Sequence, residues 1–278
     1  MFSWPDLGTR VTLRYRRAKG SVPPLTDAVG HLLAVDPVVR VRTKTGAVVE
    51  VAADDVVALR VLTDAPVRTS EIRALERAAA AASPGAERAW LEGWLLRTGD
   101  NVNYAVPLDV SAQTGTIAAI AAWYERRGLT PRLAIPDRLV PVPPGLSAEH
   151  TERVLVRDVS ASASAEPDPS ITLSARPDVT DGELMVGIHS GVALARAAVT
   201  DAPGGTRWVG LSVTRTADDQ AARATCEALL GWAAASGATR GYLVVPGTGL
   251  MALADALGFR AHHRRRYFPA RSPAWDTV

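Results

Sequence analysis

The sequence predicts an α+β protein in which a small β-barrel is followed by a mixed αβ fold. Three observations support this prediction. Residues 8–62 hold four or five short segments that alternate apolar and polar residues between Gly, Pro or Asp breakers, as in small barrels. Residues 66–135 alternate between helical and strand patterns. Residues 207–268 follow the order strand, helix, strand, helix, strand.

The N-terminal segment begins with the period of a half-buried strand. Val11, Leu13 and Tyr15 fall on one face of residues 8–17, and polar residues fall on the other. Residues 27–36, 38–43, 47–51 and 58–62 are predicted as further strands, with a tight turn at 44–46 and one helical turn at 54–55. We therefore expect a domain over residues 1–65 that is similar to an SH3-like or Sm-like barrel.

Basic residues are frequent in this barrel segment: Arg10, Arg14, Arg16, Arg17, Arg40, Arg42 and Lys44. Barrels of this type often bind nucleic acid or peptides, so one interpretation is a basic binding face. The other is an ordinary solvated face, because the outward residues of a half-buried sheet must be polar. The second interpretation is favoured, and a nucleic-acid partner stays the less favoured alternative.

A second region is expected over residues 66–145. It comprises a helix at 70–82, two strands at 89–99 and 102–108 that meet at a turn over 98–101, a helix at 114–127 and a strand at 131–135. Trp90, Trp94, Trp123 and Tyr124 are predicted to lie in its core, with the wall of a pocket as the less favoured alternative. The Pro-rich residues 141–145 mark its end.

The third region, residues 146–278, begins with predicted strands at 152–159, 171–173, 184–188 and 192–199, with a polar insert at 160–170 that we expect to be mobile. A strand at 208–214 then leads into a helix that ends at Gly237. The buried face of that helix is predicted to be Ala222, Cys226, Leu229, Leu230 and Ala233. A buried strand at 241–245, a helix at 248–257 ending at Gly258 and a strand at 260–268 complete the order.

In this order of elements, residues 207–268 resemble the acyl-CoA-binding half of the GNAT superfamily of N-acetyltransferases, including its LGF ending at 257–259. The phrases EGWLLR, NYAVPL and WYERRGLTPRLAIP resemble the strand-strand-helix-strand part of tandem-repeat members. The resemblance implies a GNAT-like mixed αβ fold, as a tandem or partial repeat. A barrel ahead of such a fold is similar to a small bacterial subgroup, some of whose members are named histone acetyltransferases.

The resemblance also implies where acetyl-CoA, as co-substrate, would bind. Two parallel strands part beside the loop that precedes the long helix, the pantetheine arm lies in the gap, and helix N-terminal amides hold the pyrophosphate because they lack partners and lie at the positive end of the helix dipole. The residues expected to bind it are Leu211, Ser212, Val213, Gln220, Ala221, Ala222 and Arg223.

The sequence departs from the family pattern at two places. The loop pattern Arg/Gln-x-x-Gly-x-Gly/Ala falls on residues 217–222, where only Ala222 fits. Gln220 brings a side chain to a position that favours glycine, and Asp218 and Asp219 add negative charge. The tyrosine that often protonates the CoA thiolate in this family falls on Ala254.

Too few residues separate the first two C-terminal strands to form the two helices that wall the acceptor site in a complete GNAT domain. We therefore expect residues 70–136 to supply that wall. No pattern assigns a catalytic residue. His189 is the least unsuitable candidate for a base, although a structural or exposed histidine is the favoured interpretation of it. Adjacent histidines at 262–263 should point to opposite faces of a surface strand, which argues against a shared metal ion, so no metal site is predicted.

The composition of the chain argues against several classes of protein. The net charge of +2 gives no whole-chain argument for nucleic-acid binding. Cys226 is the single cysteine, which excludes an intrachain disulfide, and its place on an apolar helix face favours packing over reactivity. No signal peptide pattern and no apolar run of about 20 residues is present, so a cytoplasmic location and no membrane association are expected.

Two functions stay open. The first is an acetyl-CoA-dependent N-acetyltransferase acting on a small-molecule or protein amine. The second is a catalytically inactive, GNAT-derived binding module whose barrel binds nucleic acid or a protein partner. Acyl transfer from a thioester to an amine depends mainly on positioning, which can contribute roughly 7–11 kcal/mol, so the first function does not require a strong acid or base. The sequence favours the first by family resemblance.

Overall fold

The computed structural model describes residues 4–5, 9–43, 45–62, 67–99, 102–160, 168–176, 182–247 and 249–277. It separates into two compact units, Met1–Val67 and Arg68–Val278, each of which is described by itself. Some sequence predictions fall on residues outside the described ranges: Lys44, residues 100–101 of the predicted turn, 161–167 of the polar insert, and Thr248 at the start of the last predicted helix.

The first unit is a small antiparallel sheet, confirming the prediction of a barrel-like N-terminal domain. Within its described residues five strands pair in the order β4-β3-β2-β1-β5. They are β1 Arg10–Arg16, β2 Leu25–Ala34, β3 Val39–Thr43, β4 Val48–Val51 and β5 Val56–Val61, with the turn η1 Ala53–Asp55 before the last. Val11 and Leu13 are fully buried, as their alternation predicted.

Two of the basic residues on this sheet form ion pairs with neighbours on the adjacent strand. Arg14 donates to both carboxylate oxygens of Asp27, at 2.8 and 3.1 Å. Arg40 pairs with Glu50 at 2.9 Å. Cross-strand pairs of this kind reduce the field that the face presents to an anion. The solvated-face interpretation of this barrel stays a prediction.

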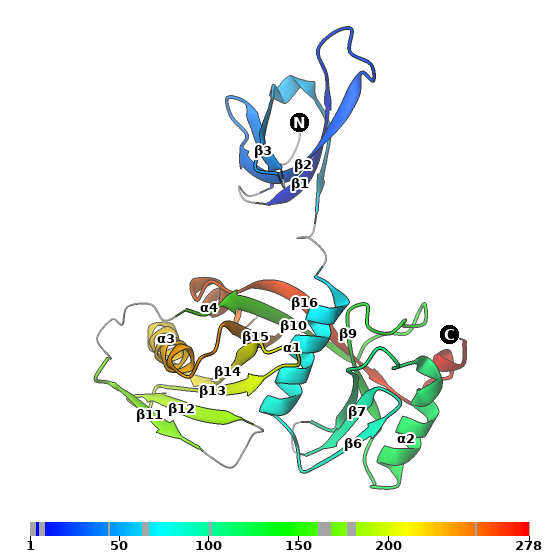
Figure 1. Cartoon of the computed structure of the whole chain (residues 1–278), viewed down its shortest axis with the longest axis vertical. Helices are drawn as coiled ribbons and strands as arrows, with labels where there is room; N and C mark the ends of the chain where they lie inside the picture. The colour runs from blue at the N-terminus through cyan, green and yellow to red at the C-terminus, as the bar shows by residue number, and fades with distance from the viewer. Residues whose placement is uncertain are drawn as a thin grey trace. The chain divides into compact units, whose positions relative to one another are not determined.

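The second unit is built on a mixed sheet. In the part of the chain that the structure describes, eleven strands follow the order β11-β12-β13-β14-β15-β10-β16-β9-β8-β7-β6 (Figure 1). The strands are β6 Glu87–Leu91, β7 Trp94–Thr98, β8 Tyr104–Pro107, β9 Arg132–Pro136, β10 His150–Asp158, β11 Ile171–Ala175, β12 Glu183–His189, β13 Ala193–Asp201, β14 Arg207–Thr216, β15 Arg240–Pro246 and β16 Arg260–Pro269.

The helices of this unit are α1 Thr69–Ala82, α2 Ile117–Glu125, α3 Asp219–Ala235 and α4 Met251–Ala256, with the short turns η2 Thr114–Thr116 and η3 Pro273–Thr277. Among the described residues, no helix combines the length and the apolarity that crossing a bilayer requires.

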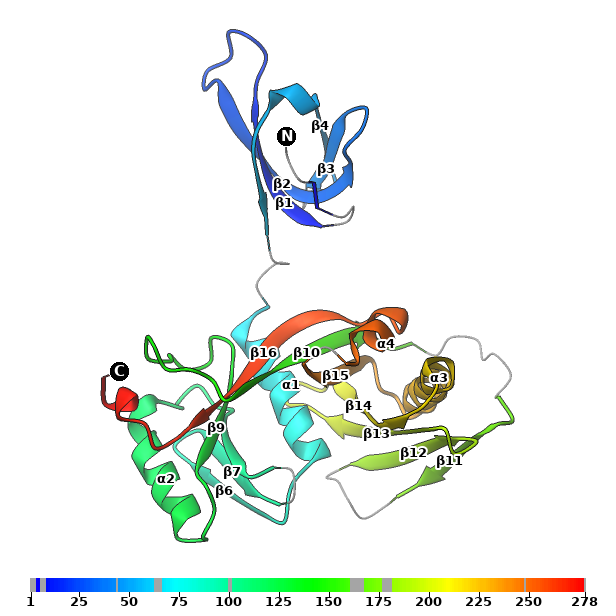
Figure 2. The same cartoon turned by 180° about the vertical axis from the view of Figure 1, so that it is seen from behind.

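The helices cover opposite faces of the sheet. Leu75 of α1 packs with Trp208 and Tyr242, whereas α3 packs with the alternate residues of the same strands, such as Val209 and Leu243. Since successive strand residues point to opposite faces, α1 lies on one face and α3 on the other. The helix α2 packs on Trp94 and Leu96, at the β6–β9 end. Figures 1 and 2 show α1 across the middle strands, with α2 and α3 toward opposite ends.

Two parallel strand pairs, each joined by a helix, are the basis of the GNAT-like fold. β14, α3 and β15 form one, and β8, α2 and β9 form the other, more loosely paired at Ala105 and Leu133. The strand β16 pairs with β10 on one side and with β9 on the other, which joins both halves in one sheet. The expected boundary at 145/146 lies within this sheet, and the division of residues 66–278 into two domains stays a prediction.

The prediction of a single strand over residues 89–99 was wrong, because this segment forms a hairpin of two strands. β6 and β7 are joined at Glu92 and Gly93, which have φ of 43° and 86°. Two positive φ angles in succession are typical of the tight turns that suit hairpins. A Cβ at residue 93 would lie 2.6 Å from the Ala112 nitrogen, so this position requires glycine. The turn leaves Trp90 55% exposed, against the prediction of a core residue, while Trp94, Trp123 and Tyr124 are buried as predicted.

Candidate functional site

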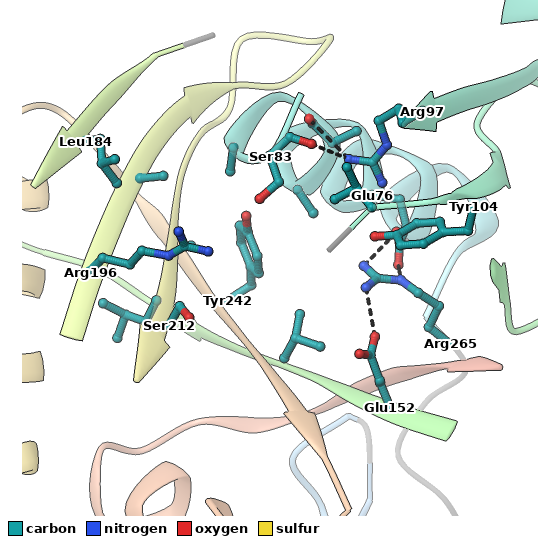
Figure 3. A pocket seen from close by; sticks show the side chains of 18 of the residues that line it. Glu76, Ser83, Arg97, Tyr104, Glu152, Leu184, Arg196, Ser212, Tyr242 and Arg265 are labelled. Carbon is teal, nitrogen blue, oxygen red and sulfur yellow. Dashed lines mark hydrogen bonds and ion pairs between the residues drawn. The ribbon is translucent and has the colours of Figure 1, made fainter. Parts of the chain in front are cut away.

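A cavity of about 260 Å³ lies on the face of the sheet that α1 covers (Figure 3). Its polar lining is unusually rich in arginine, tyrosine and glutamate. The residues that carry these side chains are Glu76, Arg97, Tyr104, Glu152, Arg196, Tyr242, Arg265 and Tyr267, with Ser83 and Ser212 beside them. Part of the wall comes from α1, β7 and β8, so the expectation that residues 70–136 face the C-terminal strands holds for this cavity.

The cavity lies where β14 and β15 part. Their parallel pairing runs from Trp208 opposite Arg240 to Leu211 opposite Leu243, and no pair beyond Leu211 is formed in the described residues. β14 nevertheless stays paired with β13 as far as Thr216. The β15-facing edge of residues 212–216 is therefore free of its parallel neighbour. Sequence analysis predicted this parted pair of strands, and the structure has it.

The predicted strand residues lie at this edge. Leu211 and Ser212 line the cavity, whereas Val213 does not. Leu211 is buried, because its side chain points to the α3 face, and the other two are half-buried. The register between β13 and β14 shifts just beyond Val213, between Leu194 and Ala195 of β13. Such a bulge redirects the strand next to the cavity.

The start of α3 is capped by its own carboxylate. Asp218 Oδ1 accepts hydrogen bonds from the amides of Gln220 at 2.8 Å and Ala221 at 3.0 Å, and the Asp218 carbonyl accepts from Ala222. This is a standard N-cap, since it satisfies amides that the first helical turn leaves unpaired. Three of the amides predicted to hold pyrophosphate are thus engaged within the chain.

The side chains at the start of α3 differ in exposure. Gln220 and Arg223 are exposed, whereas Ala221 and Ala222 are buried. Arg223 donates to Glu227 at 2.9 Å, one turn further along the helix. Arg223 is therefore placed near the helix start with one of its nitrogens already paired.

A buried ionic cluster forms one side of the cavity. Arg265 donates to both oxygens of Glu76, at 3.1 and 2.8 Å, and to Glu152 at 3.0 Å. The Tyr267 hydroxyl donates to the same Glu152 oxygen at 2.8 Å. Burial acts to raise the pKa of Glu76, but the Arg265 charge and the contacts with His263 outweigh it and lower that pKa to about 2. Glu76 is thus a carboxylate held in place by its partners.

The prediction for the two histidines of β16 was wrong. His262 and His263 do not point to opposite faces, because their Nδ1 atoms lie 2.7 Å apart. The physical reason is a bulge: Val154 pairs with His263 and Leu155 with Ala261, so His262 is an extra residue in the ladder. Burial, followed by the neighbouring His263, lowers the pKa of His262 to about 3.

The surface-strand interpretation of β16 was also wrong for two of its residues. His263 and Arg265 are buried, at 7% and 5% exposure, and His263 Nε2 lies 2.7 Å from Glu76 Oε1. The alternation of His263, Arg265 and Tyr267 was the available signal, since it puts all three on one face with an aromatic residue.

Tyr242 was missed by sequence analysis. It stands opposite Gly210 in the β14–β15 pair, and its phenol oxygen occupies the space that a side chain at residue 210 would need. Burial raises the pKa of this phenol, so it is protonated at neutral pH. The available signal was the single tyrosine in an otherwise aliphatic buried strand, beside a strand with a glycine at the matching position.

Other residues singled out in the sequence lie away from the cavity. His189 is not among its lining residues, and its Nε2 lies 3.6 Å from Asp168. Ala254 lies on α4 and is fully buried in the core cluster that α4 forms with α3. Cys226 is fully buried in the α3 core, as predicted, and burial raises the pKa of its thiol to about 12.

Comparison with known proteins identifies the family. The family model described as "Probable histone acetyltransferase Rv0428c C-terminal" matches residues 69–268, and the one described as "Rv0428c N-terminal Sm-like domain" matches residues 5–60. The chain belongs to the Rv0428c acetyltransferase family. The protein named "Probable histone acetyltransferase Rv0428c" from Mycobacterium tuberculosis is 60% identical over 304 residues, with all of both chains covered.

Members of the Rv0428c family thus join an Sm-like barrel to an acetyltransferase domain, and this chain is an acetyltransferase with a GNAT-like fold. A GCN5-related N-acetyltransferase from Kribbella flavida has the same fold, with a TM-score of 0.55 and 12% identity over 75% of this chain and 97% of its own. The recognition of the superfamily and the fold class predicted from the sequence are both confirmed.

In this Rv0428c-family chain, the expected site for the pantetheine arm of acetyl-CoA differs from the expected site for its pyrophosphate in how free the backbone groups are. The edge of β14 beyond Leu211, open to the cavity, suits an extended arm that binds backbone groups. The α3 end holds the Asp218 carboxylate on two amides that a pyrophosphate would use. The strand edge therefore suits the arm, whereas the helix start holds its own carboxylate where the pyrophosphate would bind.

Proposed function

We propose that the protein is an acetyl-CoA-dependent N-acetyltransferase whose amine acceptor occupies the cavity bounded by α1 and by the parted strands. One observation supports this proposal most: β14 and β15 separate after the pair Leu211–Leu243, and Leu211 and Ser212 of β14 line the cavity at that point. In such a transfer the amine nitrogen bonds to the acetyl carbon and the carbon–sulfur bond breaks. The amine loses one proton and the thiolate gains one.

The strand edge and the helix start have separate roles in this proposal. Leu211, Ser212 and Val213 would align the pantetheine arm and the thioester through backbone groups. Of residues 220–223, Gln220 and Ala221 would hold the pyrophosphate through their amides once the Asp218 side chain rotates away, because the Ala222 amide is bonded to the Asp218 carbonyl. Positioning of this kind brings the amine and the carbonyl together and supplies most of the catalysis that the reaction needs.

Two side chains of the cavity suit proton transfer. The hydrogen bonds that Glu152 accepts within the described residues fall on Oε2, from Arg265 and Tyr267, so Oε1 is left to accept a proton from an amine. Glu76 suits this task less, because a carboxyl with a pKa of about 2 is a weak base. Tyr242, protonated and next to the point where the strands part, would donate the proton to the thiolate in place of the phenol that Ala254 lacks.

The relative from Mycobacterium tuberculosis is named a probable histone acetyltransferase. For the present chain we propose an amine as the acceptor, and the side chains that line the cavity determine which kind of amine.

The direct test has two measurements on the full chain. Titration calorimetry with acetyl-CoA should give 1:1 binding, and exchange of Gln220→Gly should tighten that binding or leave it intact. A panel of amines, followed by release of free thiol, should then show turnover. Absence of heat at millimolar acetyl-CoA would overturn the proposal and leave the second function, a GNAT-derived binding module.

A further inference from the structure

The side chains that line the cavity carry more positive than negative charge. Arg97, Arg196 and Arg265 bring three positive charges, and Glu76 and Glu152 bring two negative charges. Both carboxylates bind Arg265, at distances of 2.8 to 3.1 Å. Within the described residues no carboxylate is paired with Arg97 or Arg196, so these two cations are left for a ligand.

Arg97 is buried without an anion. It is 3% exposed, and its Nη1 donates to the Ser83 carbonyl at 2.6 Å and more weakly to that of Ala80 at 3.4 Å. Its Nε is buried and has no hydrogen-bond partner in the part of the chain that the structure describes. A buried guanidinium with an unsatisfied N–H is costly, and an anion in the cavity would remove that cost.

Arg196 reaches the cavity from the other side. It lies on β13, on the same strand face as the cavity residue Ala198, and its side chain is exposed. Figure 3 shows the guanidinium groups of Arg196 and Arg97 directed into the cavity from different sides, with Tyr242 between them. Guanidinium groups match the planar oxygens of a carboxylate better than any other side chain does.

We propose that Arg97 and Arg196 bind a carboxylate of the acceptor, which is a small molecule bearing both an amine and a carboxylate. This inference rests on the proposed function, because it takes the cavity as the acceptor site. The volume of about 260 Å³ is slightly below the usual range for small-molecule sites and suits a ligand as small as an amino acid. The surplus of positive charge repels lysine-rich peptides, whose neighbouring side chains are cations.

The experiment compares matched acceptors on the full chain. Free amino acids and their uncharged primary amides differ only in the carboxylate, and a lysine-rich peptide forms the third arm. We expect kcat/KM, measured by release of free thiol from acetyl-CoA, to favour the best acid over its amide by at least 10-fold. The lysine-rich peptide should be a poorer acceptor than that acid.

Substitutions test whether the two arginines cause the preference for the acid over its amide. Arg196→Gln should remove most of the preference for the acid, seen as a fall in the ratio of the rate with the acid to the rate with the amide. Arg153→Gln, which neutralises an exposed arginine of β10 outside the cavity lining, should change neither rate. Because Arg97 also supports the end of α1, Arg97→Lys is the milder exchange there, checked for folding by its melting temperature.

Binding measurements keep this inference separate from the proposed function. Calorimetry of the same acids and amides on the chain, with and without CoA, needs no turnover. Acids that bind at least 10-fold tighter than amides would support the inference even if no thiol is released. Thiol release at equal rates from acids and amides would overturn it while the acetyltransferase stands, and absence of binding by any acid would overturn it as well.

Discussion

Gly210 and Tyr242 share one small volume. They are paired in the parallel register of β14 and β15, and the Tyr242 ring lies where a side chain at residue 210 would stand. The absence of a Cβ at Gly210 is what lets the phenol reach the cavity at the point where the strands part. The glycine therefore sets the position of the residue that we assign to thiolate protonation.

Gly210→Ala is expected to push the Tyr242 ring out of place. Overpacking costs typically 1–3 kcal/mol, which corresponds to a melting temperature lower by roughly 2–4 °C per kcal/mol for a domain of this size. Turnover should fall together with stability. Gly231→Ala is the matched control, since no atom lies within 4 Å of its added Cβ and the residue is inside α3. It should raise stability by about 0.5–1 kcal/mol, and a loss of activity there would contradict this account.

Tyr242→Phe should lower kcat by roughly 10²-fold, as expected for loss of a positioned acid, and leave the affinity for acetyl-CoA unchanged. Tyr124→Phe is the contrasting variant. The Tyr124 hydroxyl donates to the Arg97 carbonyl at 2.9 Å and accepts from its amide at 3.1 Å, outside the cavity lining. Its loss should reduce stability by about 1–3 kcal/mol with little change in kcat. An unchanged kcat in Tyr242→Phe would remove the phenol from the mechanism.

Asp218→Gly should tighten acetyl-CoA binding. The exchange removes a negative charge and also frees the amides of Gln220 and Ala221. We expect a gain of about 10-fold by calorimetry. Asp219→Ala is the control, because it removes a charge at the first helical position without freeing that amide pair. A charge at a helix start is worth roughly 0.3–1 kcal/mol, so this variant should tighten acetyl-CoA binding by only about 2- to 5-fold. Weaker binding by Asp218→Gly would show that the pyrophosphate does not use this helix start.

Glu76 should contribute to acid unfolding. Its pKa is about 2 in the folded chain against an ordinary value of 4.5, so the folded state binds its proton less readily than the unfolded state does. The stability that it contributes is fully present above about pH 4.5 and is lost as the pH falls toward 2.

Glu76→Gln should therefore flatten the dependence of stability on pH in that window, measured by chemical denaturation from pH 2 to pH 7. It should also destabilise the chain by about 3–5 kcal/mol near neutral pH, because Arg265 is left buried with only Glu152. If the free energy of unfolding had the same slope against pH in the wild type and in Glu76→Gln below pH 4.5, the low pKa of Glu76 would be contradicted.

The barrel should bind nucleic acid weakly or not at all. Arg14 and Arg40 are paired with Asp27 and Glu50, so fewer cations are available to neutralise phosphates. In a gel-shift assay of the full chain, any complex seen at 50 mM salt should be lost at 200 mM, since phosphate contacts weaken steeply with salt. Retention of a complex at 200 mM would favour the basic-face interpretation instead.

Most elements of the fold were predictable because their signals are local. The alternation of Val11 and Leu13, the spacing of Cys226 and Leu229 on α3, and the glycine after that helix each follow from the period of one element. The hairpin at Glu92 was missed because its turn depends on Gly93 fitting against Ala112, a contact between segments distant in sequence.

The candidate site was predictable only in part. The parting of β14 and β15 follows from the order of elements, but the cavity is assembled from α1, β7, β8 and six further strands. Glu76 and Arg265 are separated by 189 positions, and neither has a local pattern that reveals the other. The alternation rule also failed at His262, because a bulge moves one residue out of phase without any mark in the sequence.

The central place of β16 has a consequence for biosynthesis. Every other strand of the large sheet leaves the ribosome before β16, yet β16 is the strand that connects β10 with β9. The two halves can each form local hairpins and helices during translation, but their edges at β9 and β10 stay without a partner until the final strand is released. Nascent chains should therefore be most exposed to aggregation and to chaperones just before residues 260–269 emerge.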